Sequence, residues 1–480
     1  MFYNANRFHL LVVITWQFTI FFASQQLFGI FSNYEPRWKC GDDGEFGKNC
    51  SEYTRCEGNI TFEKAEFDSA VVEFKWVCND SHYTMIFSQV QFAGVLCGTL
   101  SFGAASDVYG RKPIAILAMT IGLTANFVSG LVTNIYQFFV IRYFVGLAIG
   151  GCLVVLCTFV MEMLLPQQRM ALRAFFNWGT ARLMVTLLCM WTREWRLASF
   201  ACAVTALPAL AIIIFVFPES PTWLHSKGRL DDMRESEKAI ARRAGVPYVP
   251  VQHKKIEKGK SLVEVLKGGL LKRLITLWVM WFVASTCGYA TDLNSNTISG
   301  DFYVNQCLYS ILIAASKIVL VAVDTYVPGF SRRVLHQASQ LGAVICFGAL
   351  TVLTVIEYDG TFTLVTNLIG TVFVEFTWDA CYLCAVESME TSSRASAMGS
   401  CSLMARVGAL MAPALKQLNQ QWSASLYLIV AILGTVNLLQ SYFTLVETKN
   451  VVLDNVTVTD DHNPLATSEE EAVELENGHK

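Results

Sequence analysis

The chain has 480 residues, of which 53% are hydrophobic and 16% charged, and its formal net charge at pH 7 is -3. This apolar composition is typical of a protein whose outer surface faces lipid, and it excludes an ordinary water-soluble protein of this length. A nearly neutral charge leaves no basic surface for nucleic acid. We therefore expect an integral membrane protein that binds neither DNA nor RNA.

Twelve apolar segments each approach the roughly 20 residues that a helix needs to cross a bilayer. They are too long for barrel strands and lack their alternation, so the sequence predicts an all-α membrane fold. The first segment has no cleavage site after its apolar core and is expected to remain as a helix. The predicted helices cover residues 8–31, 82–106, 112–131, 138–163, 171–191, 195–217, 273–294, 302–327, 334–356, 362–387, 395–418 and 424–446.

The distribution of Lys and Arg predicts the orientation. Residues 218–272, after the sixth helix, are rich in both, whereas the short connections near Asn134, Asn296 and Asp359 have none. Because positively charged loops stay in the cytosol, we expect this linker and both termini to be cytosolic. Apolar residues at helical spacing predict amphipathic helices within the linker. The acidic tail, 447–480, is expected to be disordered and cytosolic.

The predicted extracellular loop, residues 33–81, contains four cysteines and several glycosylation sequons. Both features suit an oxidising, glycosylating compartment. Four cysteines allow three pairings, and the sequence does not choose among them. We expect two disulfides among Cys40, Cys50, Cys56 and Cys78, and glycans on Asn49 and Asn59.

Charged residues at helix ends recur at nearly one offset along the chain, which indicates an internal repeat. The duplication predicts two six-helix halves in the same orientation, residues 1–217 and 273–446, with a solute cavity between them. The matching pairs are Arg111 with Arg332, Glu162 with Glu387, Arg169 with Arg394, and Glu219 with Glu447.

Several motifs carry a family resemblance. The loop after the second helix reads GAASDVYGRK (103–112), and further motifs are EFKWVC (73–78), RYFVGLAIGG (142–151) and PESPTWLHSKGRL (218–230). The chain thus resembles the major facilitator superfamily and, within it, the organic cation and anion transporters, closest to the organic anion branch. The resemblance implies a plasma-membrane secondary transporter with twelve helices that works by alternating access.

Charged residues at the predicted cytosolic helix ends are candidates for gating. Salt bridges there form when the inner mouth closes and break when it opens. The alternative explanation is that these residues only anchor and cap the helices. The candidate gating residues are Asp107, Arg111, Glu162, Arg169, Arg332, Glu387 and Arg394.

Ionisable side chains within membrane helices normally face a wet cavity or a partner. Lys317 and Arg406 occupy positions that are basic in the organic anion carriers of the resembling family, which favours an anionic substrate bound by two cations. Arg182 is a third candidate within a helix. Aromatic candidates for stacking on a solute are Trp281, Tyr289, Phe302 and Tyr303, of which Tyr289 matches a cavity position of the family.

Two acidic residues complicate this interpretation. Glu375 and Asp379 are spaced i, i+4 and therefore project from one face of the tenth helix. They either neutralise Lys317 or Arg406, or they contact the substrate or a coupled proton. In the first case the cavity is nearly balanced in charge and favours zwitterions.

Three functions remain open on the sequence. The first is transport of organic anions, in exchange for an intracellular dicarboxylate as the resemblance implies, or coupled to protons. The second is transport of organic cations or carnitine-like zwitterions. The third is a transport-inactive receptor or scaffold that uses the extracellular loop. The sequence contains no P-loop, nucleophile elbow or zinc-type cysteine spacing, so we expect no enzyme activity, nucleotide, cofactor or metal, with a small solute and membrane lipid as the partners.

Overall fold

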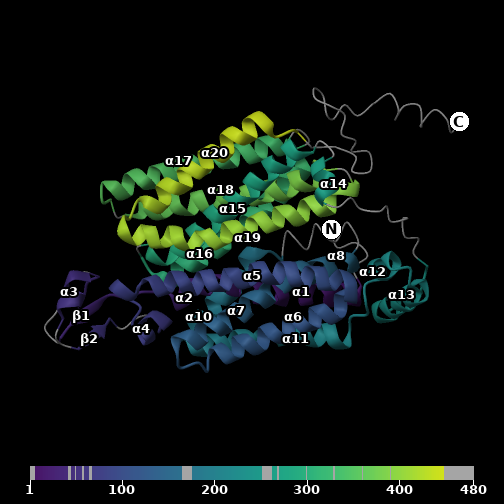
Figure 1. The fold of residues 1–480 in the computed structure, drawn as a ribbon, viewed down its shortest axis with the longest axis horizontal. Coiled ribbons are helices and arrows are strands. Elements are labelled where there is room, and N and C mark those ends of the chain that lie inside the picture. The colour runs from purple at the N-terminus through teal and green to yellow at the C-terminus, as the bar shows by residue number, and fades with distance from the viewer. Residues whose placement is uncertain are drawn as a thin grey trace.

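The computed structural model describes residues 6–41, 45–48, 50–56, 59–63, 67–164, 176–250, 262–267, 270–298, 300–327, 330–358, 360–389 and 391–447. In these residues, eleven helical segments are long and apolar enough to cross a membrane. They form two bundles that lie side by side, and the chain passes from the first bundle to the second through the linker (Figure 1). The predicted all-α membrane fold is confirmed.

The first bundle contains the helices predicted before the linker, and two of them continue through a short 3-10 or π-helical segment. Its elements are α1 (Arg7–Ala23), η1 (Ser24–Leu27), α2 (Gly29–Ser32), α5 (His82–Tyr109), α6 (Arg111–Ser129), α7 (Ile135–Gly151), η3 (Cys152–Leu156), α8 (Cys157–Met163), α10 (Trp178–Thr192) and α11 (Trp195–Phe215). The fifth predicted helix is α10, which has 15 residues. Its predicted start, residues 171–175, lies outside the described residues.

The second bundle contains the six helices predicted after the linker, and their observed ends differ from the predicted ends by a few residues. They are α15 (Leu271–Asn294) with η4 (Ser295–Thr297), α16 (Phe302–Tyr326), α17 (Arg332–Val355), α18 (Thr361–Glu387), α19 (Thr391–Gln421) and α20 (Ser425–Thr444). Hydropathy alone located these helices in the sequence, because a segment that crosses lipid must satisfy its own backbone hydrogen bonds, and a helix does so.

One end of the molecule carries the large loop between α2 and α5, and we call it the disulfide end (Figure 1). The loop contains an antiparallel pair of strands, in which Trp38 lies opposite Phe62, and disulfides join Cys40 to Cys56 and Cys50 to Cys78. This is one of the three pairings that the sequence left open. The loop's elements are β1 (Trp38–Cys40), α3 (Cys50–Arg55), β2 (Ile60–Phe62), α4 (Ala70–Phe74) and η2 (Cys78–Asp80).

The opposite end, called here the linker end, carries α12 (Pro221–Ser226), α13 (Leu230–Ala244) and α14 (Leu262–Lys267). In α13 the apolar side chains of Met233 and Ala244 are buried, as is Glu237, while five of its other charged residues are exposed. Val265 of α14 is buried in the apolar core of the second bundle. The linker is thus helical on both sides of residues 251–261, which lie outside the described part of the chain.

Glycines allow α5 and α7 to pack backbone to backbone. A Cβ atom on Gly98 would overlap the carbonyl group of Leu147, and one on Gly146 would overlap the carbonyl oxygen of Gln91. Such close approach is a common means of helix association in membranes, where apolar burial gives no driving force between helices.

We predict that Gly98→Ala destabilises the protein, because the added methyl group forces α5 and α7 apart at a cost of about 1–3 kcal/mol. The matched control is Gly103→Ala in the same helix, where the added Cβ would lie 3.4 Å from Val154 Cγ1, an ordinary contact. Thermal unfolding in detergent should show a lower midpoint for Gly98→Ala than for Gly103→Ala. Equal midpoints would contradict this account of the α5–α7 contact.

Candidate functional site

A cavity of about 200 Å³ lies between the two bundles. The first bundle supplies only neutral side chains to its wall, whereas the second supplies all of its charged ones. The lining residues are Gln26, Leu153 and Trp178 from the first bundle, and Trp281, Gly288, Tyr289, Asp292, Lys317, Glu375, Trp378, Asp379, Tyr382, Ser402, Ala405 and Arg406 from the second.

Lys317 of α16 is held by two carboxylates of α18. Its Nζ lies 2.9 Å from Glu375 Oε2 and 2.8 Å from Asp379 Oδ2, and it also donates to the Glu375 carbonyl oxygen at 3.3 Å. All three side chains are largely buried and line the cavity. Together they carry one net negative charge, so this group, called here the Lys317 triad, does not offer a free cation to a solute.

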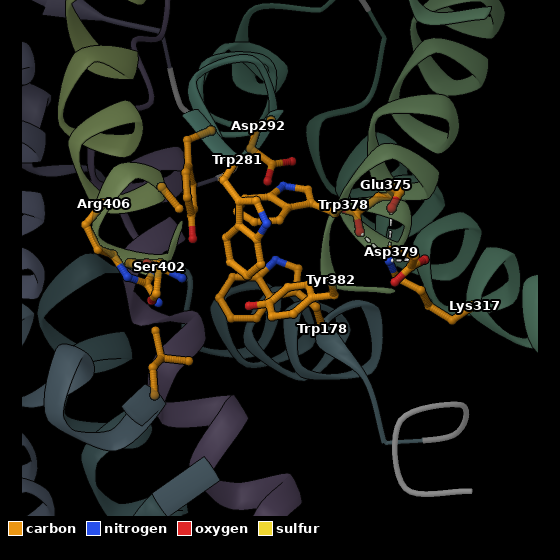
Figure 2. Close-up of a pocket in the computed structure, with 15 residues that line it drawn as sticks. Trp178, Trp281, Asp292, Lys317, Glu375, Trp378, Asp379, Tyr382, Ser402 and Arg406 are labelled. Carbon is orange, nitrogen blue, oxygen red and sulfur yellow. Dashed lines mark hydrogen bonds and ion pairs between the residues drawn. The ribbon is translucent and has the colours of Figure 1, made fainter. Parts of the chain in front are cut away.

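Arg406 of α19 is placed differently. Figure 2 shows it on one side of the cavity, with the Lys317 triad on the other side. In the described part of the chain it has no ion pair, and its buried Nε has no hydrogen-bond partner. A buried donor without an acceptor is costly, and an anionic ligand would relieve that cost.

Aromatic rings lie between these two charged regions (Figure 2). The Trp281 ring centroid lies 5.8 Å from that of Trp378 and 4.4 Å from that of Tyr382, and Trp378 and Tyr382 are stacked at 6.0 Å. A Cβ atom on Gly288 would lie 3.1 Å from Trp378 Nε1. Gly288 therefore makes room for Trp378.

The sequence interpretation missed Trp378 and Tyr382. A signal was present, since these residues share the i, i+3, i+4, i+7 face of α18 with Glu375 and Asp379. Trp281 and Tyr289 line the cavity as expected of stacking candidates.

Two aromatic candidates lie elsewhere. Phe302 is at the first turn of α16, at the disulfide end, where its ring centroid is 5.5 Å from that of Phe31 and 4.6 Å from that of Tyr34. Tyr303 donates to the Cys189 carbonyl oxygen at 3.5 Å. Neither is among the cavity-lining residues, because the start of α16 lies beyond the cavity toward the disulfide end.

Arg182 of α10 lies in the contact between the bundles. Its Nη1 pairs with Asp292 of α15, and its Nη2 donates to Gln306 Oε1 at 2.9 Å and to Ser295 Oγ at 3.4 Å. The guanidinium carbon is 5.2 Å from the Tyr309 ring centroid. Asp292 lines the cavity but Arg182 does not, so Arg182, predicted to bind substrate, instead neutralises an acidic residue of the cavity wall.

Polar contacts also join the bundles at the disulfide end. Asn296 donates to the carbonyl oxygens of Ile30 at 3.1 Å and Asn33 at 3.2 Å, and Lys416 donates to Asn296 Oδ1 at 3.1 Å. Burial raises the pKa of the neighbouring Glu35, although nearby lysines oppose the shift. This end of the cavity is therefore closed by contacts between the first and second bundles.

At the linker end the charges of the first bundle pair within that bundle. Arg111 Nη1 lies 2.6 Å from Asp107 Oδ1, and its Nε lies 3.6 Å from Glu162 Oε1. Glu219 accepts from the backbone N–H groups of Arg111 at 3.0 Å and Lys112 at 3.1 Å. A carboxylate at a helix N-terminus satisfies free backbone donors and the helix dipole.

The second bundle repeats this arrangement. Arg332 Nη1 lies 2.5 Å from Asp324 Oδ1, its Nε lies 3.2 Å from Glu387 Oε1, and Glu447 accepts from the backbone N–H groups of Arg332 at 3.0 Å and Arg333 at 3.2 Å. The sequence interpretation did not include Asp324, the counterpart of Asp107.

The remaining two gating candidates are Arg394 and Arg169. Arg394 donates to the Met389 carbonyl oxygen at 3.2 Å, which places its guanidinium against the end of α18. Arg169 lies outside the described residues, as do the glycosylation candidate Asn49 and the tail after residue 447.

The architecture of two helical bundles around a central cavity is the fold of the major facilitator superfamily. The sugar (and other) transporter family matches residues 48–459 of the chain. The Escherichia coli xylose transporter XylE, in a partially occluded inward open conformation, superposes with a TM-score of 0.65 at 14% identity, over 93% of this chain and 99% of that chain.

Relatives in sequence give the same result. An uncharacterized protein of Caenorhabditis elegans is 35% identical over 99% of both chains. Human solute carrier family 22 member 16 is 26% identical over 84% of this chain and 71% of its own length, and rat solute carrier family 22 member 7 is 25% identical over 76% and 70%. The chain therefore belongs to the sugar (and other) transporter family and is a multi-pass membrane transporter of the solute carrier 22 type, as the sequence motifs predicted.

We predict that Lys317→Met destabilises the protein by about 3–5 kcal/mol, because removal of the cation leaves two close carboxylates unpaired in a buried site. The triple variant with Lys317→Met, Glu375→Gln and Asp379→Asn should recover much of this loss, since it removes the charges together. Thermal unfolding in detergent checks both. A single variant as stable as the parent would show that the triad is already solvated from the cavity.

Proposed function

We propose that the protein carries small organic ions across the plasma membrane by alternating access, and that Arg406 binds an anionic group of the solute. The observation that carries this proposal is the contrast between the two basic residues of the cavity. Lys317 is neutralised by two carboxylates, whereas Arg406 faces the cavity without an ion-pair partner in the described chain.

The arrangement of charge supports a zwitterion as the preferred solute. An anionic group at Arg406 would leave the other end of the solute near the Lys317 triad, which has one net negative charge, and beside the rings of Trp378 and Tyr382. Cationic groups are attracted both to carboxylates and to aromatic faces. Organic anions, the substrates expected from the sequence, are the second candidate, and their support is Arg406 alone.

The orientation and the gating roles belong to this proposal as well. The basic linker end would face the cytosol, with both termini, and the disulfide end would face outside, where the exposed Asn59 would carry a glycan. The paired charges around Arg111 and Arg332 would act as latches that rearrange when the linker end closes. A coupled proton or an exchanged dicarboxylate would supply the driving force.

Uptake of three labelled probes by expressing cells tests the solute class: a carnitine-like zwitterion, a para-aminohippurate-like anion and a tetraethylammonium-like cation. We expect the zwitterion to be taken up best. Arg406→Ala should raise the KM for the zwitterion and the anion about tenfold or more. This corresponds to the loss of one charged hydrogen bond, which contributes about 1.5–3 kcal/mol.

The matched control is Arg243→Ala, which removes an exposed arginine of α13 remote from the cavity. Surface abundance is measured for every variant. Saturable uptake of the cation alone would contradict the role of Arg406, and no uptake of any probe at normal surface abundance would favour a receptor or scaffold.

We predict that Glu162→Gln changes the maximal transport rate with little change in KM, because the side chain pairs with Arg111 at the linker end and does not line the cavity. Glu387→Gln should act in the same way in the second bundle. Asp232→Asn, in an exposed pair with Arg229 on α13, is the control. Unchanged rates in both glutamate variants would leave these residues with an anchoring role only.

A further inference from the structure

Arg182 belongs to the first bundle, but every described partner of its guanidinium group belongs to the second bundle. Asp292, Ser295, Gln306 and Tyr309 surround it with a carboxylate, a hydroxyl, an amide oxygen and a ring face. We call these four residues the Arg182 socket. Each of the four groups is of a kind that binds cations, so the socket is a built cation site whose occupant in this structure is part of the protein.

Alternating access requires the Arg182 side chain to leave the socket when the bundles separate. The bundles are joined at the disulfide end by the Asn296 contacts and by the Arg182 socket itself. Separation of the bundles at this end withdraws Arg182 with the first bundle, while the socket stays with the second. Asp292 also lines the cavity, so the vacated carboxylate faces the route by which a solute enters.

We propose that the Arg182 socket binds a monovalent cation when the disulfide end is open, and that Arg182 displaces this cation when the end closes. The cation is either the ammonium group of the solute or a free alkali ion, since both match a single carboxylate surrounded by neutral oxygens and a ring. A solute ammonium displaced from Asp292 would move toward the Lys317 triad, whose carboxylates line the same cavity. This inference rests on the proposed alternating access but does not depend on which solute is carried.

The test measures closure of the disulfide end directly, so it is independent of uptake. Leu293 is 1% exposed, and its Cδ2 would lie 3.5 Å from a Cβ atom on Gly29 of the first bundle. Leu293→Cys therefore reports separation of the bundles by its rate of reaction with a membrane-impermeant maleimide. The same protein without Leu293→Cys corrects for the native cysteines.

Labelling is measured in N-methylglucamine buffer, and then with sodium, with potassium, or with the carnitine-like zwitterion added. We expect at least one of these cations to raise the labelling rate about twofold or more, because it stabilises the open state by mass action. A response to the alkali ions alone identifies a free ion as the ligand, and a response to the zwitterion alone identifies the solute ammonium. No response to any of the three overturns the proposal.

Variants separate the socket from a merely structural contact. Asp292→Asn should raise basal labelling and abolish the response to the cation, whereas Arg182→Gln should raise basal labelling and respond at a lower cation concentration. The double variant Arg182→Glu with Asp292→Lys exchanges the two charges. It should have low basal labelling and no cation response. It keeps the test informative if either single variant folds poorly. A cation response in Asp292→Asn equal to that of the parent would overturn the proposal.

The matched control is Lys416→Gln. Lys416 is another basic residue at the disulfide end, and it donates to Asn296. Its loss should raise basal labelling but leave the cation response intact. A lost response in this variant as well would attribute the effect to general opening of the disulfide end and would overturn the assignment to the socket. Failure of all uptake with an intact cation response would count against the proposed function but not against the socket.

Discussion

A charge buried in a membrane protein must be compensated inside the protein, and this constraint explains the contacts that the buried charged residues make in the two bundles. Arg142 shows it in its simplest form. Its guanidinium is fully buried and binds three oxygens, from the side chains of Gln91 and Asn126 and the carbonyl of Gln25, while Phe28 lies 4.8 Å from it. All of these partners belong to the same bundle, so this charge stays satisfied when the bundles move and contributes to a rigid unit.

Contacts within one bundle can persist when the bundles separate, whereas contacts between the bundles must break. At the linker end, Arg111 and Arg332 each pair with acids of their own bundle. Among the described residues, in contrast, the partners of the Arg182 guanidinium all belong to the other bundle. Breaking a buried pair by removal of one partner costs about 3–5 kcal/mol, so the bundles can part at Arg182 only if water or a cation compensates the charges that they expose. A coupling between ligand and conformation follows from this requirement.

The fold and part of the site could be predicted from the sequence. Hydropathy fixed the helices because lipid leaves a backbone few other options, and the repeated charges identified the halves. The i, i+4 spacing of Glu375 and Asp379 made neutralisation of Lys317 one of two explicit alternatives. The partners of Arg182 and the disulfide pairing could not be derived, because residues separated by more than a hundred positions, or several cysteines in one loop, meet only through tertiary packing.

The duplication of the fold does not extend to the cavity. The charge pairs around Arg111 and Arg332 at the linker end are equivalent in the two bundles, yet the charged groups that line the cavity all come from the second bundle. The first bundle contributes Gln26, Leu153 and Trp178, which desolvate a solute without attracting a particular charge. A solute would therefore be bound by the second bundle and covered by the first, whose Arg182 enters the second bundle as the cover closes. The two bundles share one architecture, but the proposed recognition of solute charge would belong to the second bundle alone.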